Sequence, residues 1–365
     1  YLKDNIDFHL GPGAVLLGSD NPLDYSDPYA FKLNKPSWPS ESCFGSHFVV
    51  CYERKNVTVR GPGRIDGNAK AFLVGPKGER WGQRNIPFRP AQMLYFVECE
   101  NVRVTDLRLV GAPYWSCFLL NCDRVTVRGC YIHTERRKYH TYNGDGLDLD
   151  RCRWVTVSDC RIDTADDCIT LRASAAKRLA QPRDCAYVTV ANCNLSSACN
   201  AIRPGVGEGA IHDATFSNLT ISDTRTAFNF VGAYSRTSRG PDIRDVRVSN
   251  VRVDAKSFLK MHHMYAKEAL FEDVSFDEVN AAWKKIPDAE AKKQVAEWKR
   301  TARKIAKDVT DASLLGAAKL YRGMQNILRE HGAEGISIAC IPGCYNGTLK
   351  PYPCLGFMEL QDAGL

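Results

Sequence analysis

The sequence contains no run of 18 apolar residues, so it offers no helix long enough to cross a membrane. It has 15 cysteines but no Cys-x-x-Cys pair, which weighs against zinc ribbons and thioredoxin-like redox sites. Because the number is odd, the cysteines cannot all pair internally, and their spacing supports no particular disulfide. The first residues lack a methionine and a charged-then-apolar leader, so we expect a signal peptide to be either absent or already removed.

The composition is that of a soluble globular protein, with 44% hydrophobic and 25% charged residues among 365. This length suits one large or two ordinary domains. The net charge of +7 is uneven, because residues from Met264 onward carry 14 basic and 14 acidic side chains, which leaves 35 against 28 for residues 1–263. A basic surface favours an acidic partner such as nucleic acid, acidic lipid or acidic polysaccharide, although it is also compatible with simple solvation.

A short β-rich phrase recurs along the first two thirds of the chain. Each copy alternates Val, Ile or Thr with polar residues and is followed by a Gly, Asp or Asn turn, as expected for strands buried on one face. Cysteines recur at intervals of eight residues after these strands, which fits small inward-facing residues at matched places. The copies are Asn56–Val59, Asn101–Val104, Arg124–Val127, Trp154–Val157, Tyr187–Val190, Asp213–Phe216 and Asp245–Val248.

Strands that repeat every 20–35 residues predict a solenoid in which each coil buries its inner face on the next. The Leu-x-x-Leu-x-Leu frame of a leucine-rich repeat is absent, and the hairpin turns of a propeller are missing too. We therefore expect an all-β fold, a right-handed parallel β-helix, over residues 1–264.

The pattern changes after about residue 264. Residues 288–309 and 311–332 show helical periodicity, the second with Asp311 as N-cap and Gly332 as C-cap. Residues 336–340 resemble a buried strand, and residues 270–276 could belong to either part. The sequence thus predicts a smaller α/β or helical segment over residues 265–365.

Three aspartates stand about one repeat apart. Asp145 lies in the phrase Asn143–Asp148, and Asp166 and Asp167 follow it, Asp167 after 22 residues (167 − 145). On neighbouring coils these carboxylates would lie about 4.8 Å apart, and the repulsion between them suggests a use. Aspartates that merely form turns are the alternative explanation.

Aligning the coils by their apolar residues gives a register for this region. We expect Asp145 directly over Asp167 with Asp166 beside it, because Leu147 then stacks on Ile169. The same alignment stacks Leu149, Leu171 and Ile202, and it places Asp150, Arg172 and Arg203 in one column that could hold an anionic or hydroxyl-rich ligand. Glycoside hydrolysis needs one carboxyl as acid and another to activate water, and repulsion would keep one of them protonated.

These motifs resemble glycoside hydrolase family 28, the polygalacturonase family of β-helical enzymes. Residues 143–148 are similar to its Asn-Thr-Asp-Gly-Ile-Asp, and residues 165–169 to its Gly-Asp-Asp-Cys-Ile. The resemblance covers about residues 1–260, and further phrases support it in the expected order: Gly11–Ser19, Gly61–Gly67 and Ala112–Ser116.

The resemblance implies inverting hydrolysis, with Asp166 as general acid and Asp145 and Asp167 activating water. For substrate binding we expect these residues: Asn143, Arg172, Arg203, Arg225 and Trp115. The expected partner is an acidic or neutral polysaccharide rather than nucleic acid or membrane, and the expected protein is a secreted or periplasmic monomer without metal or cofactor.

The sequence also departs from the family pattern. The Gly-His-Gly of the family should fall at residues 197–200, which contain no histidine, and its Arg-Ile-Lys should fall at residues 229–231, which contain no cation. Either the substrate differs from plain polygalacturonate or other arginines bind the acid. His133, His140 and His212 are more typical of loops than of a replacement histidine.

Residues 266–365 resemble part of an L-fucose/L-arabinose isomerase-type protein. The similar phrases are Ala333–Cys340, Pro351–Phe357 and Gln361–Gly364. The metal-binding acids of that family lie beyond this point, so we expect no isomerase activity, and the combination suggests an incomplete or chimeric reading frame.

Three functions are consistent with the sequence. The leading hypothesis is a glycosidase acting on a pectin-like or other uronate-containing polysaccharide. The others are a non-catalytic β-helix that binds carbohydrate and a uronate lyase or epimerase, which would commonly need calcium or a strong base near the cleft.

Overall fold

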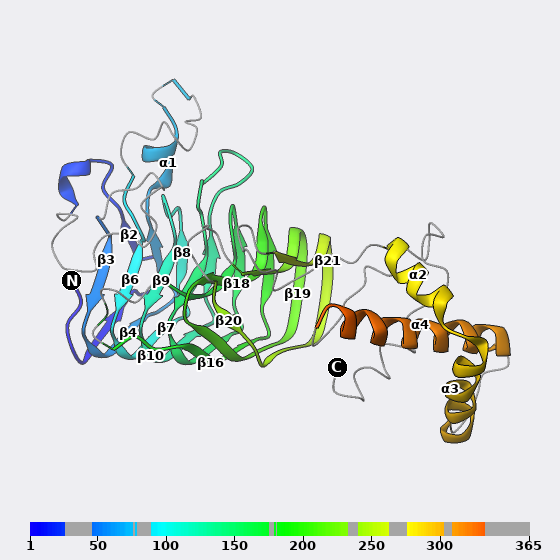
Figure 1. Ribbon diagram of the computed structural model, residues 1–365. Helices are drawn as coiled ribbons and strands as arrows, with labels where there is room; N and C mark the ends of the chain where they lie inside the picture. Colours follow the sequence, from blue (N-terminus) through cyan, green and yellow to red (C-terminus); the bar gives the residue numbers. More distant parts are fainter. Residues whose placement is uncertain are drawn as a thin grey trace. The chain divides into compact units, whose positions relative to one another are not determined.

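The computed structural model describes residues 1–25, 46–75, 77–78, 89–174, 179, 181–232, 240–262, 276–302 and 309–332. The chain divides into two compact units, Tyr1–Phe271 and Glu272–Leu365. The first unit is a parallel β-helix, as Figure 1 shows, so the predicted fold class is confirmed. Parallel crossovers of this kind are right-handed because of the inherent twist of the strands.

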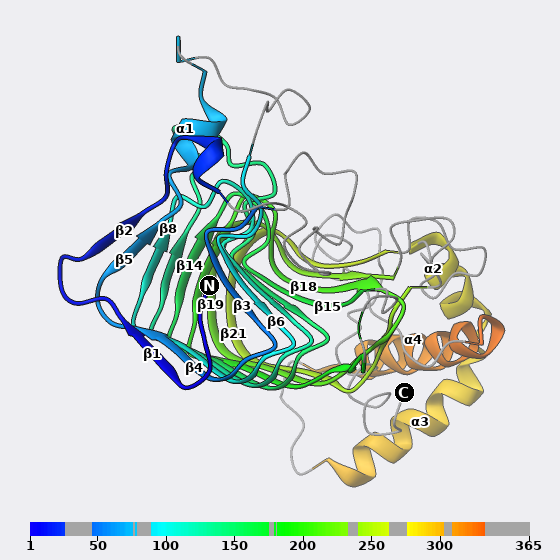
Figure 2. The same ribbon diagram turned by 90° about the vertical axis from the view of Figure 1, so that its left-hand side faces the viewer.

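Three strand columns form the three sides of the first unit's coil, which Figure 2 shows nearly end-on. The first column contains β1 (Ile6–His9), β4 (Lys55–Arg60), β7 (Glu100–Thr105), β10 (Asp123–Arg128), β13 (Arg153–Ser158) and β16 (Cys185–Ala191). The second contains β2 (Val15–Leu17), β5 (Arg64–Asp66), β8 (Arg108–Val110), β11 (Tyr131–His133), β14 (Arg161–Thr164) and β17 (Asn194–Ser197). The third contains β3 (Val49–Tyr52), β6 (Leu94–Val97), β9 (Cys117–Leu120), β12 (Leu147–Asp150), β15 (Ile169–Ala173) and β18 (Asn200–Gly207).

The last coils are built from longer strands. β19 (Ala210–Val231) pairs in turn with β16, β17 and β18, and β21 (Val246–His262) pairs along β19. β20 (Asp242–Ile243) pairs with the start of β19. A 3-10 turn, η1 (Pro22–Asp24), and a short helix, α1 (Ala69–Leu73), are inserted between strands of the early coils.

The recurring phrase forms the first column in the expected way. Its first valines stack in register from Val57 through Val102, Val125 and Val155 to Val188, and each is at most 1% exposed. The residue just before each of these valines has a left-handed backbone and turns the chain into the strand, a conformation that suits the asparagines at 56 and 101. Asparagines on neighbouring coils also hydrogen bond to each other; Asn101 Nδ2, for example, donates to Asn56 Oδ1 at 2.8 Å.

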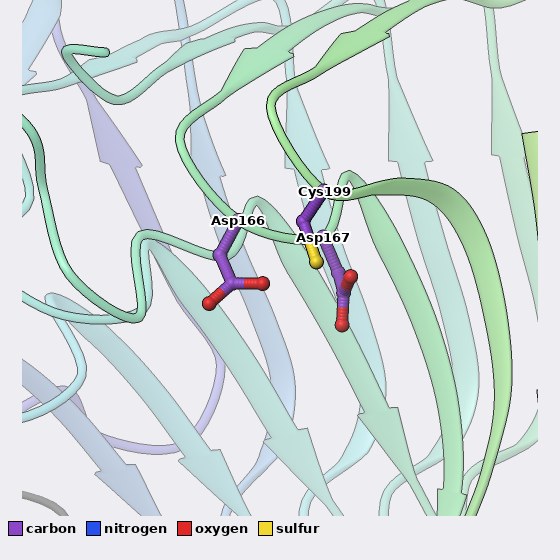
Figure 3. A group of neighbouring side chains, drawn as sticks. All are labelled: Asp166, Asp167 and Cys199. Atoms are coloured by element: carbon purple, nitrogen blue, oxygen red, sulfur yellow. The ribbon is translucent and has the colours of Figure 1, made fainter. Parts of the chain in front are cut away.

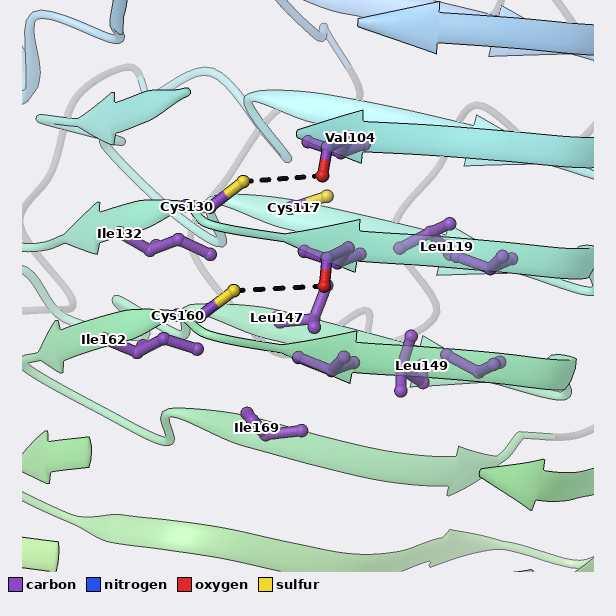
Figure 4. Close-up of a cluster of buried hydrophobic side chains, with 14 of the residues drawn as sticks. Val104, Cys117, Leu119, Cys130, Ile132, Leu147, Leu149, Cys160, Ile162 and Ile169 are labelled. Carbon is purple, nitrogen blue, oxygen red and sulfur yellow. Dashed lines mark hydrogen bonds between the residues drawn. The ribbon is translucent and has the colours of Figure 1, made fainter. Parts of the chain in front are cut away.

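The cysteines with eight-residue spacing form two buried ladders inside the coil, so this prediction is confirmed. One ladder runs through Cys122, Cys152 and Cys185, and the other through Cys130, Cys160 and Cys193. Figure 4 shows two of these thiols donating to carbonyls of the coil before, Cys130 to Val104 at 3.5 Å and Cys160 to Val127 at 3.9 Å. The thiols therefore pack as small apolar groups, and each S–H donates a weak hydrogen bond to a backbone carbonyl.

The second unit's described residues form three helices, α2 (Phe276–Lys285), α3 (Asp288–Thr301) and α4 (Asp311–Glu330). They bury Val279, Trp298, Leu320 and Met324 in a separate core. None of the described helices is long and apolar enough to cross a membrane.

Three helix boundaries differ from the prediction. The helix expected over residues 288–309 ends at Thr301, and the N-cap of α4 is Thr310 rather than Asp311. Thr310 is the N-cap because it forms a capping box with Ser313, whose backbone N–H donates to the Thr310 hydroxyl at 3.1 Å. The expected C-cap, Gly332, is also wrong by one residue, because the C-cap is His331 and Gly332 follows it with φ +59. The strand expected over residues 336–340 lies outside the described residues.

Candidate active site

Strand register brings the three predicted aspartates together at the entry to the third column. Leu147 pairs with Ile169, and the Gly146 N–H donates to the Asp167 carbonyl at 2.8 Å, so Asp145 lies directly over Asp167 as expected. Glycine is required between Asp145 and Leu147, because a Cβ on Gly146 would lie 2.6 Å from the Cys168 carbonyl oxygen. The sequence Asp-Gly-Leu-Asp thus permits two coils to approach closely at the point where the acids meet.

The backbone of Asp166 is fixed by the coils on both sides. Its carbonyl oxygen accepts hydrogen bonds at 2.6 Å from the hydroxyl of Thr164 and at 2.6 Å from that of Ser197. Its N–H donates to the Gly144 carbonyl at 3.3 Å. The Asp166 side chain is partly exposed, whereas Asp145 and Asp167 are each only 3% exposed. Asp166 is therefore the acid of the trio that a ligand can reach most easily.

Asp167 is held by two donors from the next coil. Asn200 Nδ2 donates to its Oδ1 at 2.5 Å, and Arg203 Nε donates to its Oδ2. The same guanidinium reaches the coil above, with Arg203 Nη2 3.8 Å from Asp145 Oδ2. Arg203 is 5% exposed, so it is a buried counter-ion for two acids of the trio.

This arrangement corrects the register expected for β18. Ile202 pairs with Ile169 rather than with Leu171, and Leu171 pairs with Pro204. Arg203 consequently lies opposite Thr170, not in a column with Asp150 and Arg172. The alignment by apolar residues failed here because the partner of Leu171 is Pro204, so β18 does not continue the apolar alternation of β15.

Arg172 and Trp115 lie inside the protein. Arg172 Nη1 is 3.7 Å from Asp148 Oδ1, its Nε is 3.7 Å from Asp150 Oδ2, and its guanidinium lies 4.6 Å from the Trp115 ring centre. Trp115 is 2% exposed and stacks on Tyr114. Their substrate-binding roles stay predictions, and their burial favours structural roles for both.

Asn143 and Arg225 lie closer to the surface. Asn143 has a left-handed backbone, and its Oδ1 accepts from Arg89 Nη2 at 3.3 Å. Arg225 is exposed and donates from Nη2 to the sulfur of Cys199 at 2.6 Å. Figure 3 shows Cys199 beside Asp166 and Asp167, and one donor atom of each of these three residues lies within 4.8 Å of the others.

Sequence reasoning missed three contributors to this site. Cys199 takes a place among the acids, and the only signal for it was its position where the resembled family has histidine. Asp148 is fully buried and accepts a hydrogen bond from the Thr170 hydroxyl at 2.5 Å. Its signal was its place in the same phrase as Asp145, residues 143–148. Arg89 has no local signal, since it reaches Asn143 across 54 residues.

Crowding of buried acids determines their protonation. Burial, and then the charges of Asp148, Asp166 and Asp167, raise the pKa of Asp145 well above its usual value. Burial raises the pKa of Asp148 to about 6, although Arg172 opposes this. Burial and the charge of Asp167 raise the pKa of Asp166 to about 7. At neutral pH the cluster therefore retains protons that it can donate.

Asp166, Asp167 and Cys199 also offer the donor atoms of a metal site. Two cations already contact this set, Arg203 at Asp167 and Arg225 at Cys199. A further cation would meet their repulsion, so the geometry favours acid–base chemistry over metal binding.

A cavity of about 270 Å³ lies elsewhere on the first unit. It is lined by Tyr1, Ser19, Asp24, Tyr25, His47, Phe48 and Val50. Val50 belongs to β3, four strand steps along the third column from β15, or roughly 19 Å. The aspartates therefore do not line this cavity.

Comparison with known proteins adds a family match and a set of relatives. The model of glycosyl hydrolases family 28 matches residues 39–187, which are 149 of the 365 residues. The polygalacturonase QRT2 of Arabidopsis thaliana is 26% identical over 140 residues, covering 36% of this chain and 29% of that protein. An exopolygalacturonase of Platanus acerifolia is 22% identical over 207 residues, covering 49% of this chain and 52% of that protein. The chain thus spans about a third to a half of the length of these relatives.

Solved structures share the fold. A polygalacturonase from Erwinia carotovora ssp. carotovora superimposes with a TM-score of 0.54 and 15% identity, covering 72% of this chain and 83% of that one. An exopolygalacturonase from Thermotoga maritima gives a TM-score of 0.53 and 18% identity, covering 68% and 64%. At these identities the matches show that the first unit shares the fold of those structures. The isomerase resemblance stays a prediction, because its phrases lie outside the described residues and the family match ends at residue 187.

Proposed function

We propose that the first unit is a polygalacturonase-like glycoside hydrolase that cleaves a uronate-containing polysaccharide. Its proposed catalytic residues are Asp145, Asp166 and Asp167. The observation that carries this proposal is the strand register that stacks Asp145 on Asp167 with the partly exposed Asp166 beside them. Three acids gathered at one edge of a coil repel one another, and this repulsion destabilises the fold. A cluster that the fold keeps despite this cost points to a functional role. The family match and the named relatives support the same activity.

Asp166 acts as the general acid. Its pKa of about 7 keeps much of it protonated near neutral pH, where a proton donor is most effective. Its partial exposure lets the glycosidic oxygen approach, and the Thr164 and Ser197 hydroxyls fix its backbone. Asp166 would give its proton to the leaving oxygen as the bond from that oxygen to the anomeric carbon breaks.

Asp167 and Asp145 act on the attacking water. Arg203 and Asn200 hold Asp167, and Arg203 extends to Asp145. Water would attack the anomeric carbon and give a proton to the Asp167 carboxylate, so a carbon–oxygen bond replaces the one that broke. Carboxylate oxygens of Asp166 and Asp167 lie within 4.8 Å, shorter than the roughly 6.5–9.5 Å of inverting pairs.

The substrate would be bound differently from the pattern of the resembled family. Asn229 and Val231 stand where that family has its cations, and both are buried, 6% and 0% exposed. Arg225 instead presents an exposed guanidinium that contacts Cys199. A guanidinium forms bidentate, charge-assisted hydrogen bonds with a carboxylate, so Arg225 favours a uronic acid residue as the substrate.

Product analysis on several polymers tests the proposal. Polygalacturonate, its methyl ester and a neutral polysaccharide would be incubated with the protein, with both reducing ends and ultraviolet absorbance followed. We expect reducing ends without absorbance, most from the free acid. Unsaturated, absorbing products would indicate a lyase instead, and binding without any cleavage would indicate a non-catalytic β-helix.

A further inference from the structure

Cys199 differs from the other cysteines of the β-helix. Of the eleven cysteines in the described ranges, ten are buried, and Cys199 is partly exposed. The ladder thiols donate to backbone carbonyls inside the coil, as Cys193 does to Ala191 at 3.2 Å. Cys199 instead lies outside the ladders, directly before β18, among the side chains of the proposed active site. Core packing therefore does not explain this cysteine.

The Cys199 thiol joins an acid to a cation. Its sulfur accepts hydrogen bonds from Arg225 Nη2 at 2.6 Å and from Asn200 Nδ2 at 3.1 Å. Its sulfur also lies within 4.8 Å of an Asp166 carboxylate oxygen, and the thiol lowers the pKa of Asp166 against the effect of burial. The thiol thus connects the exposed Arg225 on β19 to the proposed acid on the coil before.

The thiol is suited to this role because it stays protonated. Burial and the charges of Asp167 and Asp166 raise the pKa of Cys199 above its usual value. A neutral thiol can donate and accept at once, whereas a thiolate would repel Asp166. Alanine at this position would offer neither function, and serine would offer both.

We propose that Cys199 is a positioning residue of this site, whose thiol anchors Arg225 and orients Asp166. The catalytic consequence rests on the proposed hydrolase function, but the contact network does not. When Arg225 binds a substrate carboxylate, the thiol holds the acid at a fixed place relative to the bound sugar. Loss of the thiol would then affect both the binding of anionic substrate and the pH range of the acid.

Alkylation of Cys199 tests the network without any activity. The Cys199 sulfur displaces iodide from iodoacetamide after its proton leaves to solvent, and peptide mapping by mass spectrometry follows the rate at about pH 8.5. Asp166→Asn removes a charge that raises the thiol pKa, so we expect faster alkylation. Arg225→Met removes a charge that lowers it, so we expect slower alkylation. Each pKa unit changes the rate about tenfold.

The control for this experiment is Arg128→Met, which removes an exposed arginine from β10. Its alkylation rate should stay within about twofold of wild type. If Asp166→Asn and Arg225→Met also leave the rate within that range, or change it in the same direction, the proposed network is wrong, whatever the protein catalyses.

Activity profiles test the catalytic consequence. Hydrolysis should fall as pH rises through the pKa of Asp166, because the acid must be protonated. Cys199→Ala removes the thiol that lowers the pKa of Asp166. The alkaline limb of the kcat/KM profile, where activity falls, should therefore move to higher pH by about half to one unit. KM for the acidic polymer should rise as well. Cys199→Ser should return the limb toward wild type.

Cys193→Ala serves as the matched control, since this cysteine is buried in a ladder and donates to the backbone. It should lower thermal stability and leave the limb unchanged. A lower kcat in Cys199→Ala without a shift of the limb, or no rescue by serine, would overturn the positioning role. Absence of hydrolysis by the wild-type protein would overturn the proposed function, while the alkylation rates would still decide the network.

Discussion

Arg203→Met should destabilise the β-helix in a way that depends on pH. The guanidinium contacts Asp167 and lies 3.8 Å from Asp145, and none of the three side chains is more than 6% exposed. Removing one partner of a buried ion pair leaves an uncompensated charge and costs about 3–5 kcal/mol. The methionine keeps most of the side-chain volume, so this loss is electrostatic rather than a cavity effect.

The dependence on pH follows from the neighbouring acids. Arg203 lowers the pKa of Asp145, Asp148 and Asp166, each of which burial raises, so the variant has still higher values. Unfolded aspartates titrate at about pH 3.9. Below that pH the carboxyls are protonated in both states, so the variant and the wild type differ least. The unfolded state is the same in both proteins, so the difference arises as pH rises through 6 and 7. There Asp148 and Asp166 ionise in the folded wild type but resist ionisation in the folded variant, so the destabilisation grows.

Urea unfolding followed by far-ultraviolet circular dichroism measures this effect between about pH 4 and pH 8. We expect a loss near 3 kcal/mol or more at about pH 7.5 that shrinks on acidification. Arg128→Met, at an exposed position of β10, should change stability by less than about 0.5 kcal/mol at either pH. A loss below about 1 kcal/mol for Arg203→Met, or one that does not change with pH, would refute the reasoning.

Three further predictions concern other parts of the chain. The pH profile of kcat/KM should fall above about pH 7, the pKa of Asp166, and a profile flat to pH 9 would contradict its role as acid. Cys160→Val should overpack a ladder and lower the unfolding free energy by about 1–3 kcal/mol in urea titrations, whereas an unchanged midpoint would argue against close packing there. Thr310→Ala should remove the capping box of α4 and destabilise the second unit by about 1 kcal/mol, with Thr301→Ala at the end of α3 as the comparison.

The sequence predicted the β-helix well because its signal is repeated. Each copy of the phrase alternates apolar residues, mostly Val, with polar ones, and this alternation is readable without tertiary context. The same alternation gave the correct register of β12 on β15, since Leu147 and Leu149 have apolar partners in Ile169 and Leu171. The stacking of Asp145 on Asp167 followed from that register.

The next coil could not be predicted in the same way. Leu171 pairs with Pro204, which is not an apolar β-former, and the pairing shifts beyond it. The alternation therefore suggested the wrong partner, and Arg203 was placed in the wrong column. Its true role as a counter-ion depends on a long side chain reaching two coils, which no local pattern encodes.

The role of Cys199 was also hidden. An apolar-looking cysteine in a chain with 15 of them carries no special signal, and its contacts come from separate segments, Asp166 and Arg225. The cap of α4 shows the same limit on a smaller scale. Thr310 and Asp311 are both good N-caps, and only the geometry of Ser313 decides between them.

Reducing-end release by wild type and Asp166→Asn, side by side on polygalacturonate, tests the central claim most directly. Asp106→Asn is the matched control, because Asp106 is an exposed turn residue with a left-handed backbone that asparagine also tolerates. We predict that the wild type and Asp106→Asn cleave the polymer equally and that Asp166→Asn loses about 10²–10⁴-fold in rate. Equal cleavage by all three proteins would contradict the assignment of Asp166 as the acid and with it the account of the aspartate site.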